Sequence, residues 1–164
     1  MRNLFGSVAL VGLALSSASA LAEGPDEKTT SQRFKDWESI CVERASTTQC
    51  RATQTLVNQQ GQTVAVLNWY RPNAERMVFE LAVPLLVDLS QGVAVSFDGA
   101  EPLKRNVRFC NNVACFVLAE SDQELLDNFK RGSGGTLSFT PFGQQSNALN
   151  FSLQGFSAAY DSLK

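Results

Sequence analysis

Residues 77–83 read MVFELAV, and their alternation decides the fold class. The apolar side of such an extended chain consists of Met77, Phe79, Leu81 and Val83, whereas Glu80 and Ala82 lie on the opposite side. A period of two means that one face of a strand packs in a core and the other faces water. This stretch therefore predicts a half-buried β-strand, with Phe79 in the core.

Similar runs lie on both sides of this strand. Residues 103–109 and 149–154 also alternate, with Leu103, Val107 and Phe109 on one face of the first run and Leu149, Phe151 and Leu153 on one face of the second. Residues 63–70 are apolar on both faces and predict a central, covered strand. Short runs separated by turn residues predict an all-β, mostly antiparallel, sandwich-like single domain. A closed barrel would produce the same pattern, so it remains the alternative.

One helix interrupts the strands. Ser121 and Glu124 have the spacing of a capping box, and Gly132 ends the helical pattern. The apolar stripe of this helix consists of Leu125, Leu126 and Phe129. A second short helical turn is expected at residues 157–163. Trp37 is expected in the core, where its loss, like that of Phe79, would cost about 3–5 kcal/mol.

The first 22 residues have the three parts of a secretory leader. Arg2 supplies the positive start, residues 4–15 form an uncharged apolar run, and small residues lead to cleavage signals that end at Ala20 and Ala22. The run is shorter than the about 20 residues of a membrane-spanning helix, and no later segment is long and apolar enough to span a bilayer. We therefore expect leader cleavage after Ala20 or Ala22, no transmembrane segment in the mature chain, and a periplasmic, outer-surface or secreted protein.

The mature chain has the length of one domain. Residues 23–33 are polar and predict a flexible N-terminus, so the domain is expected over residues 34–164. The full chain has a net charge of −2, which provides no electrostatic reason to expect nucleic acid or anionic lipid as a partner.

The four cysteines are Cys41, Cys50, Cys110 and Cys115. An even number in an exported chain predicts two disulfides, and three pairings are available. The pairs Cys41–Cys50 and Cys110–Cys115 are favoured, because each would close a short loop between neighbouring strands. Each would stabilise the fold by roughly 2–3 kcal/mol.

The chain contains no histidine, which excludes Ser-His-Asp and Cys-His catalysis and imidazole ligands for a metal. The cysteine spacings differ from the C-x-x-C of thiol-redox enzymes. Residues 132–135 (GSGG) follow a helix, where the dipole disfavours an anion, and predict a helix stop with a flexible loop. We expect no catalytic, cofactor or metal site. A periplasmic enzyme, either thiol-redox or acid-catalysed, is the alternative.

Basic residues are candidates for a contact patch, although solvated strand edges and a helix C-terminus explain them better. They are Arg71, Arg76, Lys104, Arg105, Arg108, Lys130 and Arg131. Arg105 lies on the same face of the predicted strand as the apolar residues Leu103 and Val107. This position predicts either a place at the sheet margin or an acidic partner.

Four stretches carry a family resemblance: residues 34–41, 83–99, 109–115 and 153–159, with the helix at 125–132 in matching place. In this order, with four cysteines and a leader, the chain resembles the invasion-associated locus B family of small exported bacterial proteins. The sequence departs from the family at Leu86 and Ala114, where glycine is usual, so the turn geometry there is in question.

The resemblance implies an envelope protein linked to invasion or virulence and supplies no catalytic motif. We therefore expect a binding or accessory module that meets a protein or surface-glycan partner through strand faces and loops. The contact surface is expected around Lys104, Arg108, Asn111 and Asn112. A structural protein that supports envelope integrity is a further alternative.

Overall fold

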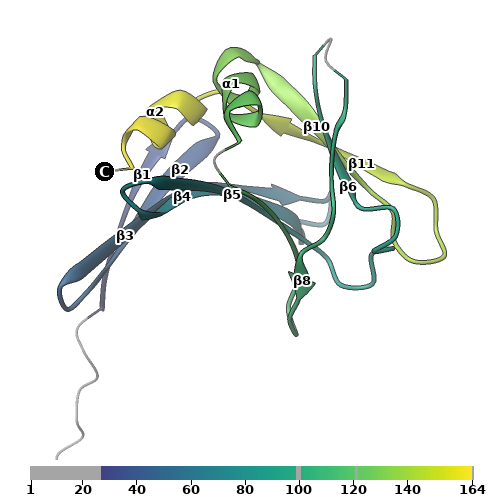
Figure 1. Cartoon of the computed structure of the whole chain (residues 1–164), viewed down its shortest axis with the longest axis horizontal. Coiled ribbons are helices and arrows are strands. Elements are labelled where there is room, and N and C mark those ends of the chain that lie inside the picture. The colour runs from purple at the N-terminus through teal and green to yellow at the C-terminus, as the bar shows by residue number, and fades with distance from the viewer. Residues whose placement is uncertain (1–26, 99–100, 121, 164) are drawn as a thin grey trace, which may run out of the picture.

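Two antiparallel β-sheets share one apolar core in the computed structural model, which describes residues 27–98, 101–120 and 122–163 (Figure 1). The larger sheet has seven strands in the order β1-β2-β3-β4-β5-β9-β8, and the smaller has four in the order β11-β10-β6-β7. Each sheet is open at its edges, so the expected sandwich-like fold is confirmed and the closed barrel is not formed.

The strands of the larger sheet are β1 (Glu27–Phe34), β2 (Trp37–Arg44), β3 (Thr47–Val57), β4 (Thr63–Asn73), β5 (Arg76–Val83), β8 (Phe109–Cys110) and β9 (Cys115–Glu120). Those of the smaller sheet are β6 (Val93–Phe97), β7 (Leu103–Arg105), β10 (Gly134–Phe139) and β11 (Asn147–Ser152). Helices α1 (Gln123–Arg131) and α2 (Phe156–Asp161) lie on the same side of the larger sheet as the smaller sheet does (Figure 1).

The core lies between the inner face of the larger sheet and this cover of helices and strands. Trp37 and Phe79 are fully buried, as expected. Phe129 of α1 lies at the centre, with six aromatic rings at centroid distances of 4.9–6.0 Å. These rings come from both sheets and from α2, so one side chain joins all layers of the fold.

A buried glutamine connects the two sheets by hydrogen bonds. The Nε2 of Gln54, on β3, donates to the carbonyl oxygens of Asp36 and Ser152, both at 3.1 Å. Its Oε1 accepts from the backbone N–H of Ser152, also at 3.1 Å. Because β11 ends at Ser152, this side chain pairs with the end of a strand in the opposite sheet and leaves no buried polar atom of its own unsatisfied.

The alternation in residues 77–83 and 149–153 is confirmed. Phe79, Leu81 and Val83 are buried on β5, and Phe151 and Leu153 are buried at the other side of the core. Residues 63–70 form a central strand as expected, but the expectation that both of its faces are covered is wrong. Val64 and Val66 face outward and are only half-buried, because no described element packs on the outer face.

Residues 103–109 do not form one strand, which corrects the expectation of a single alternating run. Leu103 belongs to β7 in the smaller sheet, whereas Phe109 belongs to β8 in the larger one. The segment between them crosses from one sheet to the other. Phe109 is therefore 48% exposed rather than buried beside Leu103 and Val107.

The expected flexible N-terminus is wrong for residues 27–33. This segment forms most of β1, an edge strand that pairs antiparallel with β2 in unbroken register from Glu27 opposite Arg44 to Phe34 opposite Trp37. Its side chains are exposed on both faces, so it lacks the alternation that marks a strand. Residues 23–26 and the expected leader at 1–22 lie outside the described residues.

Helix α1 is confirmed, but its cap differs from the expected capping box. Asp122 is the N-cap, and its Oδ1 accepts from the backbone N–H of Leu125 at 3.0 Å. Ser121 lies outside the described residues. The C-terminal helical turn is confirmed as α2. Gly134 and Gly135 open β10, so the expected flexible loop after Gly132 is wrong.

Both favoured disulfides are confirmed, and they use all four cysteines. Cys41 lies directly opposite Cys50 on β2 and β3, and Cys110 lies opposite Cys115 on β8 and β9. Each bond joins neighbouring strands of the larger sheet.

No helix of the described residues is long and apolar enough to cross a membrane.

The two positions where the chain lacks the family's glycine differ in geometry. Leu86 has φ +65°, in the left-handed region that favours glycine, and its side chain is 81% exposed. For a residue with a Cβ this conformation costs about 1–2 kcal/mol. Ala114 is not among the residues with positive φ. The residue that stands in place of the usual glycine therefore strains the backbone at Leu86 and not at Ala114.

Candidate functional site

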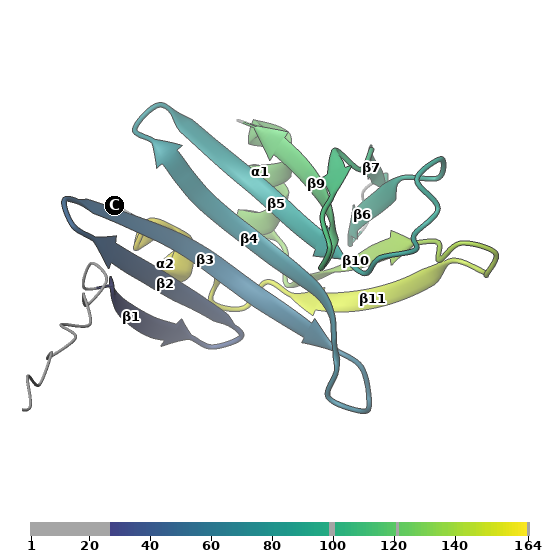
Figure 2. The same ribbon diagram turned by 90° about the horizontal axis from the view of Figure 1, so that it is seen from below.

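The outer face of the larger sheet is not covered by any described element (Figure 2). The strand register sets rows of outward side chains across it. One row runs from Arg51 through Tyr70 to Val78, and the next runs from Thr53 through Asn68 and Glu80 to Leu118. A third row holds the apolar side chains Val66, Ala82, Phe116 and Phe109. The face thus has a polar part and an apolar part.

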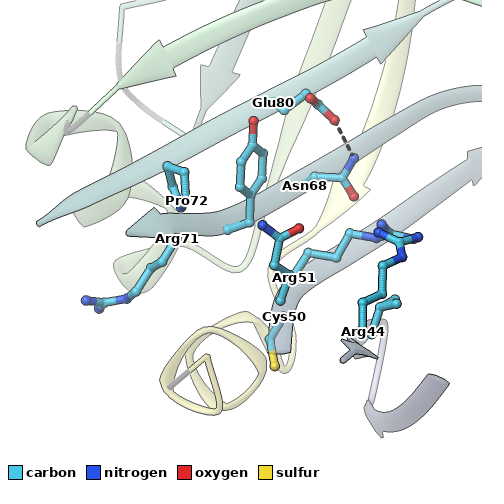
Figure 3. Close-up of a pocket in the computed structure, with 10 residues that line it drawn as sticks. Arg44, Cys50, Arg51, Asn68, Arg71, Pro72 and Glu80 are labelled. Atoms are coloured by element: carbon cyan, nitrogen blue, oxygen red, sulfur yellow. Dashed lines mark hydrogen bonds between the residues drawn. The ribbon is translucent and has the colours of Figure 1, made fainter. Parts of the chain in front are cut away.

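A pocket of about 280 Å³ lies in the polar part, between β2, β3, β4 and β5 (Figure 3). The side chains that matter for its chemistry are those of Arg44, Arg51, Asn68, Tyr70, Arg71 and Glu80. They come from four consecutive strands, so the pocket exists only because these strands pair in this register.

The floor of the pocket is an amide–carboxylate pair in which the amide is buried and the carboxylate is half-buried. Asn68 is 9% exposed, and its Nδ2 donates to Glu80 Oε1 at 3.0 Å. Its Oδ1 is buried and accepts no hydrogen bond from any described residue. Buried polar atoms are nearly always hydrogen-bonded, so an unpaired acceptor here marks a place where a donor is missing.

The three arginines of the pocket differ in their contacts. Arg44 Nε lies 2.8 Å from Glu27 Oε2, and this ion pair raises the pKa of Arg44. Figure 3 shows the side chain of Arg71 directed away from the other two, and its guanidinium lies 6.0 Å from the centre of the Tyr160 ring. Arg51 is exposed and forms no ion pair with a described residue. It is therefore the cation best able to meet a ligand.

Tyr70 completes the pocket beside Arg51. Burial raises the pKa of its hydroxyl above the ordinary value, and the nearby carboxylates of Glu80 and Glu120 raise it further. The hydroxyl is therefore protonated at neutral pH and can donate a hydrogen bond. A cation, a phenol and a buried acceptor suit the binding of a polar group, and none of them is a nucleophile or a base activated by a neighbour.

An apolar groove of about 410 Å³ adjoins the same face at the end where β5 finishes and β9 begins. Its lining includes Val64, Val66, Leu85, Val113 and Phe116, and it contains no charged side chain. The aromatic ring of Phe109 stacks on that of Phe116 with a centroid distance of 4.9 Å.

None of the four expected contact residues lines the pocket or the apolar groove. Asn111 and Asn112 are in the β8–β9 turn, where Asn111 Oδ1 accepts from the backbone N–H groups of Val113 and Ala114 at 2.8 and 3.0 Å. Asn111 therefore shapes the turn. Arg108 immediately precedes β8, whereas Lys104 belongs to β7 in the other sheet.

The seven basic residues considered above do not form one patch. Four of them lie in ion pairs in different places, namely Arg76 with Glu120, Arg105 with Asp122, Lys130 with Asp161 and Arg131 with Asp127. The acidic partner expected for Arg105 is thus found. Because Asp122 also caps α1, this ion pair connects β7 to the helix.

The pocket residues Arg51, Asn68, Tyr70 and Glu80 were missed by sequence reasoning. A signal was available for two of them, because Asn68 and Glu80 are polar residues inside otherwise apolar strands. Both alternate with the core residues of their strands, so the sequence pattern places them on the outward face. What the sequence does not contain is the pairing of Asn68 with Glu80 and of Arg51 with Tyr70, which depends on the order of the strands.

These features define a small disulfide-braced β-sandwich protein with one uncovered sheet face. The chain belongs to the invasion associated locus B family, because the sequence profile described as "Invasion associated locus B (IalB) protein" matches residues 37–164. The fold is similar to the crystal structure of invasion associated protein B from Bartonella henselae, with a TM-score of 0.70 and 22% sequence identity. That match covers 80% of this chain and 92% of the other. No curated protein matches the chain.

Proposed function

We propose that the protein is exported and acts as a non-catalytic binding or accessory module of the bacterial envelope, in host-cell invasion or in envelope function. The family match, the disulfides and the leader-like first 22 residues support export. The partner is a protein or a surface glycan that meets the outer face of the larger sheet.

The observation that carries the proposal is the open face of this sheet (Figure 2). A sheet in a sandwich is expected to present polar side chains to water on its outer face. Here the outer face combines half-buried apolar residues, such as Val66 and Phe116, with the pocket around Arg51 and Tyr70. An apolar area beside a few polar groups is typical of a surface that another molecule covers.

A non-catalytic role predicts that no thiol is available for chemistry. In the native protein we expect no reaction with a thiol-specific reagent, and after reduction in denaturant we expect four reactive thiols, because all cysteines lie in the two disulfides. Treatment of the native protein with a mild reductant should release none. Thiols that open and reform during this treatment would favour the thiol-redox alternative.

The binding face can be tested by photocrosslinking in the native bacterium. A photoreactive phenylalanine derivative at position 70, in the pocket, should produce a discrete adduct of higher mass on illumination. The same derivative at position 131 should not, because Arg131 belongs to α1 on the other side of the larger sheet (Figure 2). The adduct should disappear when Arg51→Glu is added and persist when Arg131→Glu is added.

Adducts from both positions, or from position 131 alone, would contradict this placement of the partner. Host-cell entry by a deletion strain is the functional readout, and Arg51→Glu should restore it less well than Arg131→Glu. Protease accessibility on intact cells, with a known periplasmic protein as the protected control, then decides between the periplasm and the outer surface.

A further inference from the structure

Large apolar side chains that are exposed gather at one end of the molecule. They lie on the β5–β6 connection (Leu85, Leu86, Leu89), on the β8–β9 hairpin (Phe109, Val113) and on the β10–β11 turn (Phe142), and Val57 ends β3 at the same end. Leu86, Val113 and Phe142 are 81%, 74% and 75% exposed. We call this set of side chains the apolar end.

Contacts between the turns make the apolar end one surface. The backbone N–H of Phe142 donates to the carbonyl oxygen of Leu86 at 2.6 Å, which connects a turn of the smaller sheet to the end of a strand in the larger one. Val87 forms a β-bridge with Pro141 beside it. Leu85 and Val113 line the same groove. Turns from both sheets therefore hold their apolar side chains in fixed relation to one another.

The opposite end has a different composition. There the β2–β3 turn contains Ala45 and Ser46, the β4–β5 turn contains Ala74 and Glu75, and no large apolar side chain of the described residues is exposed. Exposed large hydrophobic residues scattered singly need no explanation, but a cluster on the tips of several turns does. The molecule thus has an apolar end and a polar end along the strand direction.

Two cations flank the apolar end. Arg108 precedes β8, and Lys104 pairs with Ala94, one residue into β6 from the β5–β6 connection. Both are exposed and neither forms an ion pair with a described residue, whereas other basic side chains such as Arg76 and Arg105 do. The acidic Asp88 on the connection accepts hydrogen bonds from Ser90. Two cations without an ion-pair partner among the described residues thus lie near exposed apolar side chains. This arrangement is complementary to a surface that carries phosphate groups above an apolar layer.

We propose that the apolar end docks on the surface of an anionic phospholipid bilayer. Leu86, Val113 and Phe142 enter the boundary between headgroups and acyl chains, and Lys104 and Arg108 meet lipid phosphates. A protein partner would bury its anchors in one well-packed patch, whereas these side chains protrude from separate turns, and a bilayer accepts each of them independently. The orientation leaves the pocket on the outer sheet face open, so this membrane contact is additional to the function proposed above.

The test is co-flotation of the exported, disulfide-bonded protein with vesicles at 0.15 M salt. We expect binding to vesicles of phosphatidylcholine with about one-third phosphatidylglycerol, and at least tenfold weaker binding to pure phosphatidylcholine. Higher salt should weaken the binding, because exposed charges are screened. The net charge of −2 provides no general attraction to these vesicles, so binding would have to come from a local feature.

Matched variants place the contact. Leu86→Asn with Phe142→Gln should weaken binding at least tenfold, and the exposed sites allow both changes without loss of packing. Ala45→Asn is the control, since Ala45 also has positive φ, at +49°, but lies at the polar end. Lys104→Glu with Arg108→Glu should abolish the preference for anionic vesicles, whereas Lys28→Glu with Arg33→Glu, on the exposed edge strand β1, should leave it within twofold.

A fluorescent probe reports the orientation independently. The tryptophan emission of the Phe142→Trp variant should shift to the blue when vesicles are added, and that of the Ala74→Trp variant, changed at the polar end, should not. Absence of vesicle binding by the unmodified protein, or equal binding by the Leu86→Asn/Phe142→Gln variant, overturns the proposal. If the unmodified protein binds no vesicles but crosslinks to a protein from a photoreactive residue at position 113, and the Leu86→Asn/Phe142→Gln variant loses that crosslink, the apolar end is a protein-binding surface and the lipid proposal is wrong. The pocket-directed crosslink at position 70 is unaffected in either case.

Discussion

Replacement of Phe129 by alanine is expected to lower the free energy of unfolding by about 3–5 kcal/mol, a large part of the about 5–15 kcal/mol of an ordinary domain. Phe129 is 1% exposed and contacts aromatic rings from both sheets and from α2. Its removal opens a cavity where the layers meet, and the surrounding rings cannot close it without moving both sheets. Urea unfolding followed by tryptophan fluorescence measures the loss, because Trp37 and Trp69 are both partners of Phe129.

Phe142→Ala is the matched control. The same side chain is removed, but from a turn where it is 75% exposed, so the free energy of unfolding should change by less than about 0.5 kcal/mol. A loss below about 1 kcal/mol for Phe129→Ala would mean that α1 is not packed in the core as described.

Gly155→Ala should destabilise the protein by about 2–5 kcal/mol, although it adds only one methyl group. Gly155 precedes α2 with φ +91°, a conformation that costs a residue with a Cβ about 1–2 kcal/mol. A Cβ there would also overlap the carbonyl oxygen of Phe34, at the turn between β1 and β2. Relief of that overlap requires a shift of the backbone, for which the overpacking cost is about 1–3 kcal/mol.

Gly143→Ala separates the two contributions. Gly143 has a similar φ of +72°, but nothing lies within 4 Å of the position that its Cβ would occupy. Its replacement should therefore show only the conformational cost of about 1–2 kcal/mol. Thermal unfolding of both variants measures the difference. Equal losses would show that the approach of Gly155 to the β1–β2 turn does not constrain the fold.

Much of the fold could be predicted because local patterns record local structure. The alternation in residues 77–83 identifies the buried face of β5, the stripe of Leu125 and Phe129 identifies the buried face of α1, and the spacing of the cysteines favours the two short-range disulfides. Strand β1 could not be predicted, since an exposed edge strand has no buried face and its stability comes from backbone pairing with β2. The same limit explains residues 103–109, where the alternation continues although the chain changes sheets.

The candidate site was less accessible to sequence reasoning. Arg51, Tyr70 and Glu80 lie up to 29 positions apart in the chain and become neighbours only through the register of β3, β4 and β5. The expected contact residues Lys104 and Arg108 were chosen for their charge, and the structure places neither in the pocket, since Lys104 lies on β7 of the smaller sheet and Arg108 immediately precedes β8.

Residue type and spacing along the chain were enough to predict the class of fold, the leader-like N-terminus and the family resemblance, and to favour one of three disulfide pairings. The pairing of Asn68 with Glu80 in an open pocket, and the position of Leu86 and Phe142 at one end of the molecule, became visible only in the folded chain. The physical reason is that hydrophobic periodicity specifies which face of a strand is buried but not which strand lies beside it. The residues that meet on a surface built from several strands or turns therefore depend on which strands pair.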